Sequence, residues 1–267
     1  MNTEELKSIT HAAIEVVKEA ANFIRHESKK FRQSAVEYKG SNDLVSYVDK
    51  ASEEMLVKGL SKILPGCSFI TEENTVKETD AAYKWIIDPL DGTTNFVHGV
   101  PCFCISVALM EEKKLVVGII HELNLDECFY AWRGGGAYVN GTSIRVSEIN
   151  ELKKSLLATG FPYSNYDRMK PYMEVFDWCM RHTHGLRRLG SAAADMAYVA
   201  AGRFEGFYEY GLNAWDVAAG IVLIEEAGGK VGDFSGGDNA LFGKEIISTN
   251  CAVYDEFLGV VKNKFLN

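Results

Sequence analysis

The chain lacks the features that mark several large classes of protein. None of its six cysteines forms a Cys-x-x-Cys pair, and its six histidines show no metal-ligand spacing. No apolar run approaches the length of a membrane span, and the N-terminus has no apolar segment like that of a signal peptide. Low-complexity tracts and Pro- or Ser-rich linkers are also missing. These absences argue against membrane-spanning and secreted proteins, and they predict a cytoplasmic protein with free thiols.

An excess of basic residues is missing as well. The chain has 28 Lys and Arg against 37 Asp and Glu, a net charge of −9. Nucleic-acid backbones call for clustered Lys and Arg, and the nearest approach to a basic patch is the short stretch from Arg181 to Arg188. We therefore do not expect nucleic acid as the main partner. A small phosphorylated substrate stays compatible with this charge, because bound metal ions can reverse the local field.

The chain does contain enough apolar residues for a sizeable core, since 47% of its 267 residues are hydrophobic. Apolar residues at helical spacing predict a long helix over residues 3–30, followed by a polar turn at 38–43 and a second helix that ends at Pro65-Gly66. Strand patterns then dominate to residue 132, with Gly-rich hairpin turns at 133–136 and 140–141. From residue 155 onward strands and helices alternate. Because no linker separates the halves, we expect two packed subdomains, residues 1–150 and 151–267, in one compact unit.

The most informative segment runs from Asp88 to Phe96, with the sequence Asp-Pro-Leu-Asp-Gly-Thr-Thr-Asn-Phe. It follows Trp85-Ile86-Ile87, a run typical of a buried strand, so two carboxylates stand where that strand is expected to end. Gly-Thr-Thr then predicts a helix start, with Asp91 near its cap. Two acids beside a helix N-terminus suit hard cations and a phosphate, although a capped turn alone would also explain an isolated Asp-Gly-Thr.

A second acidic segment precedes a strongly apolar helix. Asp216 lies in Trp-Asp-Val-Ala-Ala-Gly at the expected start of that helix, and Gly228-Gly229 closes it. Small residues after the acid favour close packing of the helix against a neighbour. A plain N-cap is the simpler interpretation of Asp216 taken alone.

Together the two segments resemble the inositol monophosphatase family, the magnesium-dependent, lithium-sensitive phosphomonoesterases. Two further segments, around Glu72 and from Lys39 to Asp49, look like the family's metal-binding glutamate and its mobile loop with the following helix start. Leu189 to Asp195 and Ala158 to Pro162 also resemble family segments, bacterial ones in particular. The resemblance covers residues 5–265 and implies a layered α/β/α/β/α sandwich of the inositol monophosphatase and fructose-1,6-bisphosphatase type, commonly a homodimer.

The resemblance also implies a metal site that holds two to three Mg²⁺ ions. By position, Glu72, Asp88 and the carbonyl of Leu90 bind the first ion, and Asp88, Asp91 and Asp216 bind the second. A weaker third ion is expected near Glu72. The chemistry of the four carboxylates agrees, because magnesium favours oxygen ligands and four converging unpaired acids would repel one another.

The remaining roles come from the same resemblance. Thr93 and Asp49 are expected to orient and deprotonate the attacking water, and Glu72 belongs with them to the catalytic set. The resemblance further implies that a small phosphorylated polyol is the substrate. The amides of Gly92 and Thr93 are expected to bind its phosphate, and the remaining substrate-binding residues are Ser191, Ala192, Glu209 and Asp216.

The residues fit three alternative classes of protein less well. Phosphatases with an aspartyl nucleophile carry Asp-x-Asp-Gly-Thr, whereas Pro89 and Leu90 put two residues between the acids here. An EF-hand loop fails because Leu90 stands where a third-position ligand is needed. A non-catalytic protein that binds a macromolecule has weak support from Arg187 and Arg188, for which a solvated or dimer-contact pair is the simpler interpretation.

The substrate is less well defined. Relatives in the wider lithium-sensitive superfamily hydrolyse 3′-phosphoadenosine phosphates, fructose 1,6-bisphosphate or inositol polyphosphates, and NADP is a further alternative. The nucleotide-directed branch usually has Lys-Glu after Asp-Gly-Thr, whereas this chain has Thr94-Asn95. The sequence therefore favours inositol monophosphate and similar sugar or polyol phosphates, with broad specificity.

Overall fold

A computed structural model describes residues 1–31, 36–38, 44–162 and 166–265. Most of the polar turn predicted at 38–43, and with it part of the segment that resembles the family's mobile loop, lies outside these residues. Among them are seven α-helices, fourteen strands and a short 3-10 helix at Leu152–Lys154. Two short strands, β1 and β2, pair only with each other; their bounds are Val36–Tyr38 and Leu44–Ser46.

The larger sheet has seven strands in the order β3-β4-β5-β6-β7-β8-β9. All neighbours are antiparallel except β3 and β4, which run parallel, so six strands follow the chain as a meander. Its strands are β3 (Ser68–Thr71), β4 (Tyr83–Asp91), β5 (Cys104–Glu111), β6 (Lys114–Glu122), β7 (Glu127–Trp132), β8 (Gly136–Val139) and β9 (Thr142–Ile144).

The smaller sheet has five strands in the order β11-β10-β12-β14-β13. β10 is parallel to both of its neighbours, whereas β14 is antiparallel to β12 and β13. Its strands are β10 (Leu156–Thr159), β11 (Gly185–Arg187), β12 (Gly206–Tyr210), β13 (Lys230–Gly232) and β14 (Glu245–Thr249).

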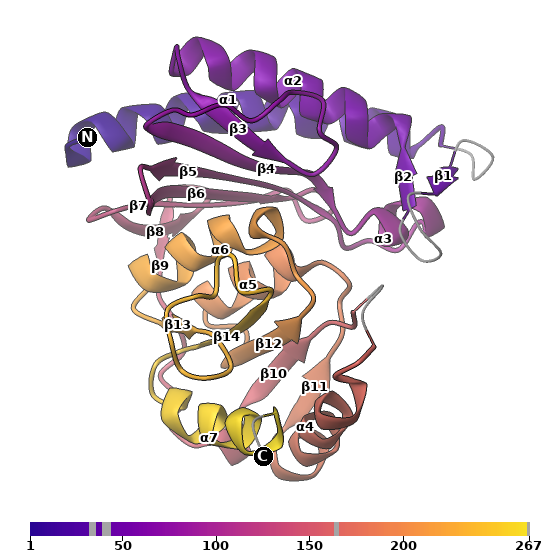
Figure 1. The fold of residues 1–267 in the computed structure, drawn as a ribbon, viewed down its shortest axis with the longest axis vertical. Coiled ribbons are helices and arrows are strands. Elements are labelled where there is room, and N and C mark those ends of the chain that lie inside the picture. Colours follow the sequence, from indigo (N-terminus) through magenta and orange to yellow (C-terminus); the bar gives the residue numbers. More distant parts are fainter. Residues whose placement is uncertain (32–35, 39–43, 163–165, 266–267) are drawn as a thin grey trace.

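The helices form three layers around the two sheets (Figure 1). α1 and α2 cover the outer face of the larger sheet, α5 and α6 lie between the sheets, and α4 and α7 cover the outer face of the smaller sheet. The predicted α/β/α/β/α sandwich is therefore confirmed. The helix bounds are α1 (Thr3–Ser28), α2 (Tyr47–Ile63), α3 (Thr93–His98), α4 (Met169–His182), α5 (Ala192–Ala200), α6 (Ala214–Glu226) and α7 (Tyr254–Phe265).

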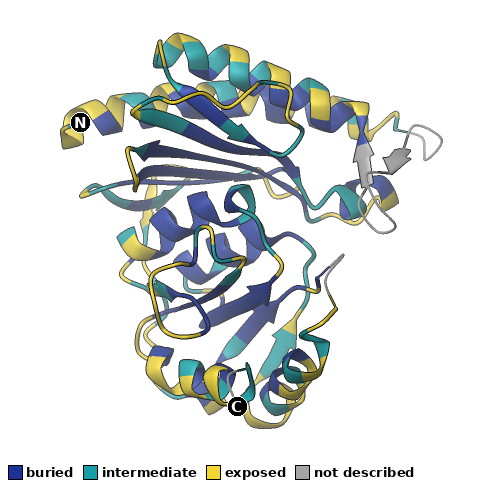
Figure 2. Cartoon of the chain, in the orientation of Figure 1, coloured by how far each residue is buried: buried dark blue, intermediate teal, exposed yellow. Residues whose placement is uncertain are grey.

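The central helix α6 is buried because its sequence is apolar on nearly every side. Figure 2 shows α5, α6 and the longer strands β4, β5, β6 and β12 as the buried middle of the molecule, with exposed residues on the outer helices. A helix without a polar stripe needs partners on both faces, and the two sheets provide them. Gly118 of β6 lets α6 approach closely, since a Cβ at that position would lie 2.4 Å from the carbonyl oxygen of Ala219.

Some short strands were not predicted from the sequence. β11 and β13 have three residues each, too few to show a periodic pattern. The two Gly-rich stretches predicted as hairpin turns do join β7 to β8 and β8 to β9. β7 was predicted, whereas β8 and β9 were missed because they are only partly buried. The long helix ends at Ser28 and not at residue 30.

The predicted boundary near residue 150 falls between the last strand of the larger sheet and the first strand of the smaller one. That the two parts are packed subdomains of one compact unit stays a prediction, and α6 packs against the larger sheet although it belongs to the second part of the chain. The six cysteines are free thiols, as predicted. Within the described ranges, no helix combines the length and the apolar character that a membrane crossing requires.

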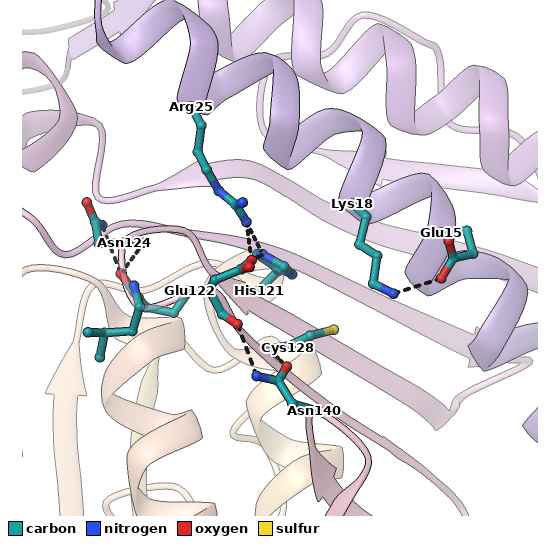
Figure 3. Close-up of polar contacts among 10 residues, drawn as sticks. Glu15, Lys18, Arg25, His121, Glu122, Asn124, Cys128 and Asn140 are labelled. Carbon is teal, nitrogen blue, oxygen red and sulfur yellow. Dashed lines mark hydrogen bonds and ion pairs between the residues drawn. The ribbon is translucent and has the colours of Figure 1, made fainter.

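A buried histidine lies where α1 crosses the end of β6 (Figure 3). The Arg25 guanidinium donates to Nε2 of His121 over 2.7 Å, and the Asp126 carboxylate lies 3.1 Å from the same nitrogen. Nδ1 of this ring has no partner among the described residues. Burial, and after it the charge of Arg25, lowers the pKa of His121 to about 4. The ring is therefore neutral in the folded protein at neutral pH.

This histidine should make the fold sensitive to acid. The unfolded state binds the proton near pH 6.5 and the folded state only near pH 4, so the free energy of unfolding falls as pH drops through that window. We expect a loss of about 2 kcal/mol from this group by pH 5. Thermal melts at pH 7.5 and pH 5 test this prediction. The decrease in Tm between the two pH values should be smaller for His121→Gln than for the unmodified chain. An identical pH-dependent change in Tm for both proteins would contradict it.

Candidate active site

The two acids of the most informative segment lie in the last part of β4, a strand that has β3 and β5 as its neighbours in the larger sheet. The sequence predicted that the strand ends at these acids, and β4 includes both and ends at Asp91. The pairing with β5 shifts register between these two residues, so a bulge and not a strand end separates the carboxylates. Asp88 is buried, and its Oδ1 accepts from the amide of Leu90 over 2.9 Å.

Gly92 makes the turn that follows. It has φ +95°, and a Cβ there would lie 3.0 Å from the carbonyl oxygen of Cys102, so glycine is the residue that fits. Gly92 is the N-cap of α3, and Asp91 directly precedes it, so Asp91 lies near the cap as predicted. Asp91 reaches the start of α5, where its Oδ2 accepts from Ser191 Oγ and from the amide of Ala193, each over 2.6 Å.

The other two predicted metal acids come from separate elements. Asp216 is the third residue of α6, and its Oδ2 accepts from the amide of Asn213 over 2.6 Å, so it closes a capping box. Glu72 follows β3 directly, and its amide donates to the carbonyl of Ile87 on β4 over 3.3 Å. The N-cap of α6 is Asn213, so Asp216 is not a plain N-cap but the third helical residue of a capping box, and the same carboxyl also faces the acids of β4.

The four acids line one cavity, and their electrostatic coupling shows how closely they converge. Burial, followed by the charges of Glu72, Asp91 and Asp216, raises the pKa of Asp88 well above its usual range. Burial and then the charges of Asp91 and Glu72 raise the pKa of Asp216 in the same way. Asp88 also has hydrogen-bond contact with the carboxyls of Glu72 and Asp216.

The carboxyl oxygens of the four acids are suitable ligands for a hard cation, although the side chains are not arranged around one metal position. In the part of the chain that the structure describes, no three His, Cys, Asp or Glu side chains stand in an arrangement that could hold a metal ion. Neighbouring carboxyls without a cation repel one another or share protons, which keeps them from closing around one point. All-oxygen ligands of this kind are those that Mg²⁺ and Ca²⁺ prefer.

A threonine connects the cavity to a buried acid behind it. Thr93 Oγ1 lies 3.0 Å from both Asp49 Oδ1 and the carbonyl of Leu90. Asp49 is buried in the first turn of α2, and its Oδ2 accepts from the Ser46 amide over 2.9 Å and from Ser46 Oγ over 2.6 Å. Burial raises the pKa of Asp49 from its ordinary value, and these hydrogen bonds act against that shift. Asp49 is not part of the cavity wall, so its access to the cavity passes through Thr93.

The other residues predicted beside the alcohol line the same cavity. Glu209 lies in β12 with 6% of its surface exposed, and it sits so close to Gly160 that a Cβ there would lie 2.0 Å from Glu209 Oε2. Ser191 is the N-cap of α5, with its hydroxyl shared between Asp91 and the amide of Ala194. Ala192 follows at the cavity surface. The structure thus brings every predicted site residue to the cavity, with Asp49 one step behind it.

Sequence reasoning missed two charged residues of this cavity. Arg188 was interpreted as a solvated or dimer-contact residue, but it lines the cavity with its guanidinium 5.2 Å from the ring centre of Phe161. Asp195, on α5, also lines the cavity and is buried. Asp195 lies in the segment from Leu189 to Asp195 that resembles the family, and Arg188 directly precedes it. That resemblance is the feature of the sequence that could have indicated both residues.

The fold and the acidic cavity together define a layered α/β protein of the inositol monophosphatase type. The crystal structure of extragenic suppressor protein suhB from Bartonella henselae superimposes with a TM-score of 0.90 at 36% identity, over 96% of this chain and 98% of that chain. The model of the inositol monophosphatase family matches residues 5–263, so the chain belongs to that family.

Two named relatives cover nearly the whole chain. Inositol-1-monophosphatase from Mesorhizobium japonicum is 38% identical over 256 residues, which are 96% of each protein. Nus factor SuhB from Escherichia coli K12 is 39% identical over 253 residues, 94% of this chain and 95% of that protein. The family and the first of these names support a phosphatase.

Proposed function

We propose that this protein is a magnesium-dependent phosphomonoesterase that hydrolyses inositol monophosphate and related sugar or polyol phosphates. The observation that carries the proposal is the meeting of four carboxyls from β3, β4 and α6 in one cavity, beside a threonine backed by a buried aspartate. Acids that are brought together at such electrostatic expense indicate a site for cations.

The residues divide between holding metal and moving a proton. One Mg²⁺ would be held by Glu72, Asp88 and the Leu90 carbonyl. A second would be held by Asp88, Asp91 and Asp216. A third, more weakly bound ion would lie near Glu72. Bound there, the ions would lower the pKa of a water and neutralise charge on the ester oxygens. The amides of Gly92 and Thr93 would hold the phosphate.

Thr93 supplies the path for the proton. Its hydroxyl is within hydrogen-bond distance of Asp49, so Thr93 can accept a proton from the attacking water while passing its own to that carboxylate. The water oxygen then forms the new bond to phosphorus as the bond to the ester oxygen breaks. The leaving oxygen takes a proton from solvent water, and Asp49 returns the proton it received to solvent. No side chain needs to form a covalent intermediate.

The alcohol side of the cavity supports a neutral polyol. Glu209 and Asp195 face it with carboxyls, and Arg188 is the cation that balances them. Fructose 1,6-bisphosphate, 3′-phosphoadenosine phosphate and NADP, each with additional phosphate, remain the alternative substrates. We also propose a homodimer in the cytoplasm, in keeping with the family resemblance and the six free thiols.

A binding role is the second candidate, because relatives at similar identity carry the name Nus factor SuhB. A purely binding protein would have no need to keep four mutually repelling acids in one cavity. Loss of phosphatase activity without loss of partner binding in a metal-acid variant would show that both roles coexist.

The proposed activity is tested by phosphate release from a panel of phosphomonoesters. Inositol 1-phosphate should be turned over with Mg²⁺, activity should vanish in excess chelator, and lithium should inhibit by taking a magnesium position with less charge. The panel should include fructose 1,6-bisphosphate, 3′-phosphoadenosine 5′-phosphate and NADP. Full turnover in chelator would contradict the metal mechanism, and a preference for one of the other substrates would replace the substrate assignment.

Glu209→Gln should weaken recognition of the alcohol part of the substrate and leave the hydrolysis step itself unchanged. A carboxylate can accept from two polyol hydroxyls, and losing hydrogen bonds to a charged group costs about 1.5–3 kcal/mol. The catalytic efficiency with inositol 1-phosphate should therefore fall roughly 10- to 100-fold, whereas an aryl phosphate without hydroxyls should be affected far less. Equal losses on both substrates would assign Glu209 to metal or structural support.

A further inference from the structure

Asp195 is a buried acid on the cavity wall that the mechanism above does not use. It lies in the first half of α5 with 1% of its surface exposed. Its Oδ1 has no hydrogen-bond partner among the described residues. A buried oxygen left in this state is unfavourable, so such atoms are usually satisfied by a ligand, an ion or ordered water. The neighbouring cavity is the route by which a ligand could reach it.

The groups around Asp195 are mostly of its own sign. Burial is the main cause that raises its pKa, and the charges of Glu209 and Asp91 add to it. Arg188 acts in the opposite direction on all three acids. One guanidinium therefore faces three carboxyls on this side of the cavity, and two of them, Asp195 and Glu209, are outside the proposed metal set.

This arrangement discriminates between two kinds of alcohol. A hydroxyl can donate to a carboxyl oxygen, so a polyol can satisfy an acceptor that the protein leaves without a donor. A second phosphate on the substrate presents mainly acceptor oxygens and negative charge, which carboxyls repel. The Arg188 guanidinium already acts on all three acids and lies 5.2 Å from the ring centre of Phe161.

We propose that Asp195 is a specificity-determining residue, which together with Glu209 favours polyols that present hydroxyl donors and disfavours alcohols that carry a second phosphate. This inference rests on the proposed phosphatase function. It extends that function to a residue without an assigned role and to a defined difference between substrates.

The test compares fructose 1-phosphate with fructose 1,6-bisphosphate, which differ only in the second phosphate. Asp195→Asn keeps the shape of the side chain and replaces one of its two oxygens with an NH2 donor. The ratio of kcat/KM for fructose 1-phosphate to that for the bisphosphate should fall by about tenfold or more in this variant. An aryl phosphate should be turned over at an unchanged rate. Asp80→Asn is the matched control, because Asp80 is an exposed acid away from the cavity.

An unchanged ratio, or an equal loss on all three substrates, would overturn the proposal, since a merely structural role predicts equal losses. If Asp195→Asn does not fold, the same ratio of kcat/KM values is measured for Asp195→Ser and for the unmodified enzyme, and these two values test the proposal. An unmodified enzyme that prefers the bisphosphate contradicts the proposal. The aryl phosphate tests the proposed phosphatase function independently of Asp195, because this substrate has no polyol hydroxyls. If the aryl phosphate is not hydrolysed in the presence of magnesium, both the phosphatase function and the role of Asp195 are overturned.

Discussion

Asp216→Asn should lower the turnover number by roughly 10³-fold or more, while the protein stays folded. Asp216 is one of three acids assigned to the second magnesium, and losing one charged ligand from a catalytic ion forfeits several kcal/mol of transition-state stabilisation. The asparagine oxygen can still accept from the Asn213 amide, so the capping box at the start of α6 should survive. Steady-state kinetics at ordinary magnesium concentration measure the loss.

A melting experiment separates this effect from damage to the fold. Burial and neighbouring acids disfavour the charge of Asp216, so its removal should leave the metal-free Tm unchanged or higher. Asp91→Asn should lose activity to a similar degree, and Asp255→Asn, at an exposed acid of α7, should keep it. Near-normal rates in Asp216→Asn or Asp91→Asn would mean that the second metal has been placed wrongly.

The sequence allowed the local parts of the site to be predicted well. The segment from Asp88 to Phe96 combines a buried strand, a glycine turn and a helix start, and each is encoded by neighbouring residues. What the segment did not show is the bulge between Asp88 and Asp91, since the bulge depends on pairing with β5. The helix of Asp216 was equally clear, because its apolar run ends at two glycines.

Contacts between distant segments were beyond local patterns. Asp91 is oriented by the N-terminus of α5, a hundred residues later in the chain. Arg188 belongs to a short basic stretch that is typical of solvent-exposed surface, and only the packing of the 188–195 segment against the cavity turns it inward. Asp195 stands among alanines in a helix, where a single acid gives no indication of the wall that it faces. The resemblance placed Asp49 and Thr93 in one role, and the fold brings their side chains to 3.0 Å.

That contact leads to the last prediction, because Thr93 connects Asp49 to the cavity. Thr93→Ala should lower the turnover number by about 10²- to 10⁴-fold, the range expected when general-base assistance is lost. Without the hydroxyl, the Asp49 carboxylate keeps both bonds from Ser46 but has no group through which to take the proton. Magnesium affinity should change little, since Thr93 is assigned to the water and not to the metal.

Thr93→Ser is the matched control for this variant, because it keeps the hydroxyl and loses only the methyl group. It should retain most of the activity if proton transfer to Asp49 is the role of this position. A magnesium titration of Thr93→Ala, read from the rate, checks the division of labour. Thr93 Oγ1 is also within hydrogen-bond distance of the Leu90 carbonyl, which is assigned to the first ion. A collapse of magnesium affinity together with the rate would therefore show that Thr93 positions that carbonyl for metal binding, and the water would then need another base.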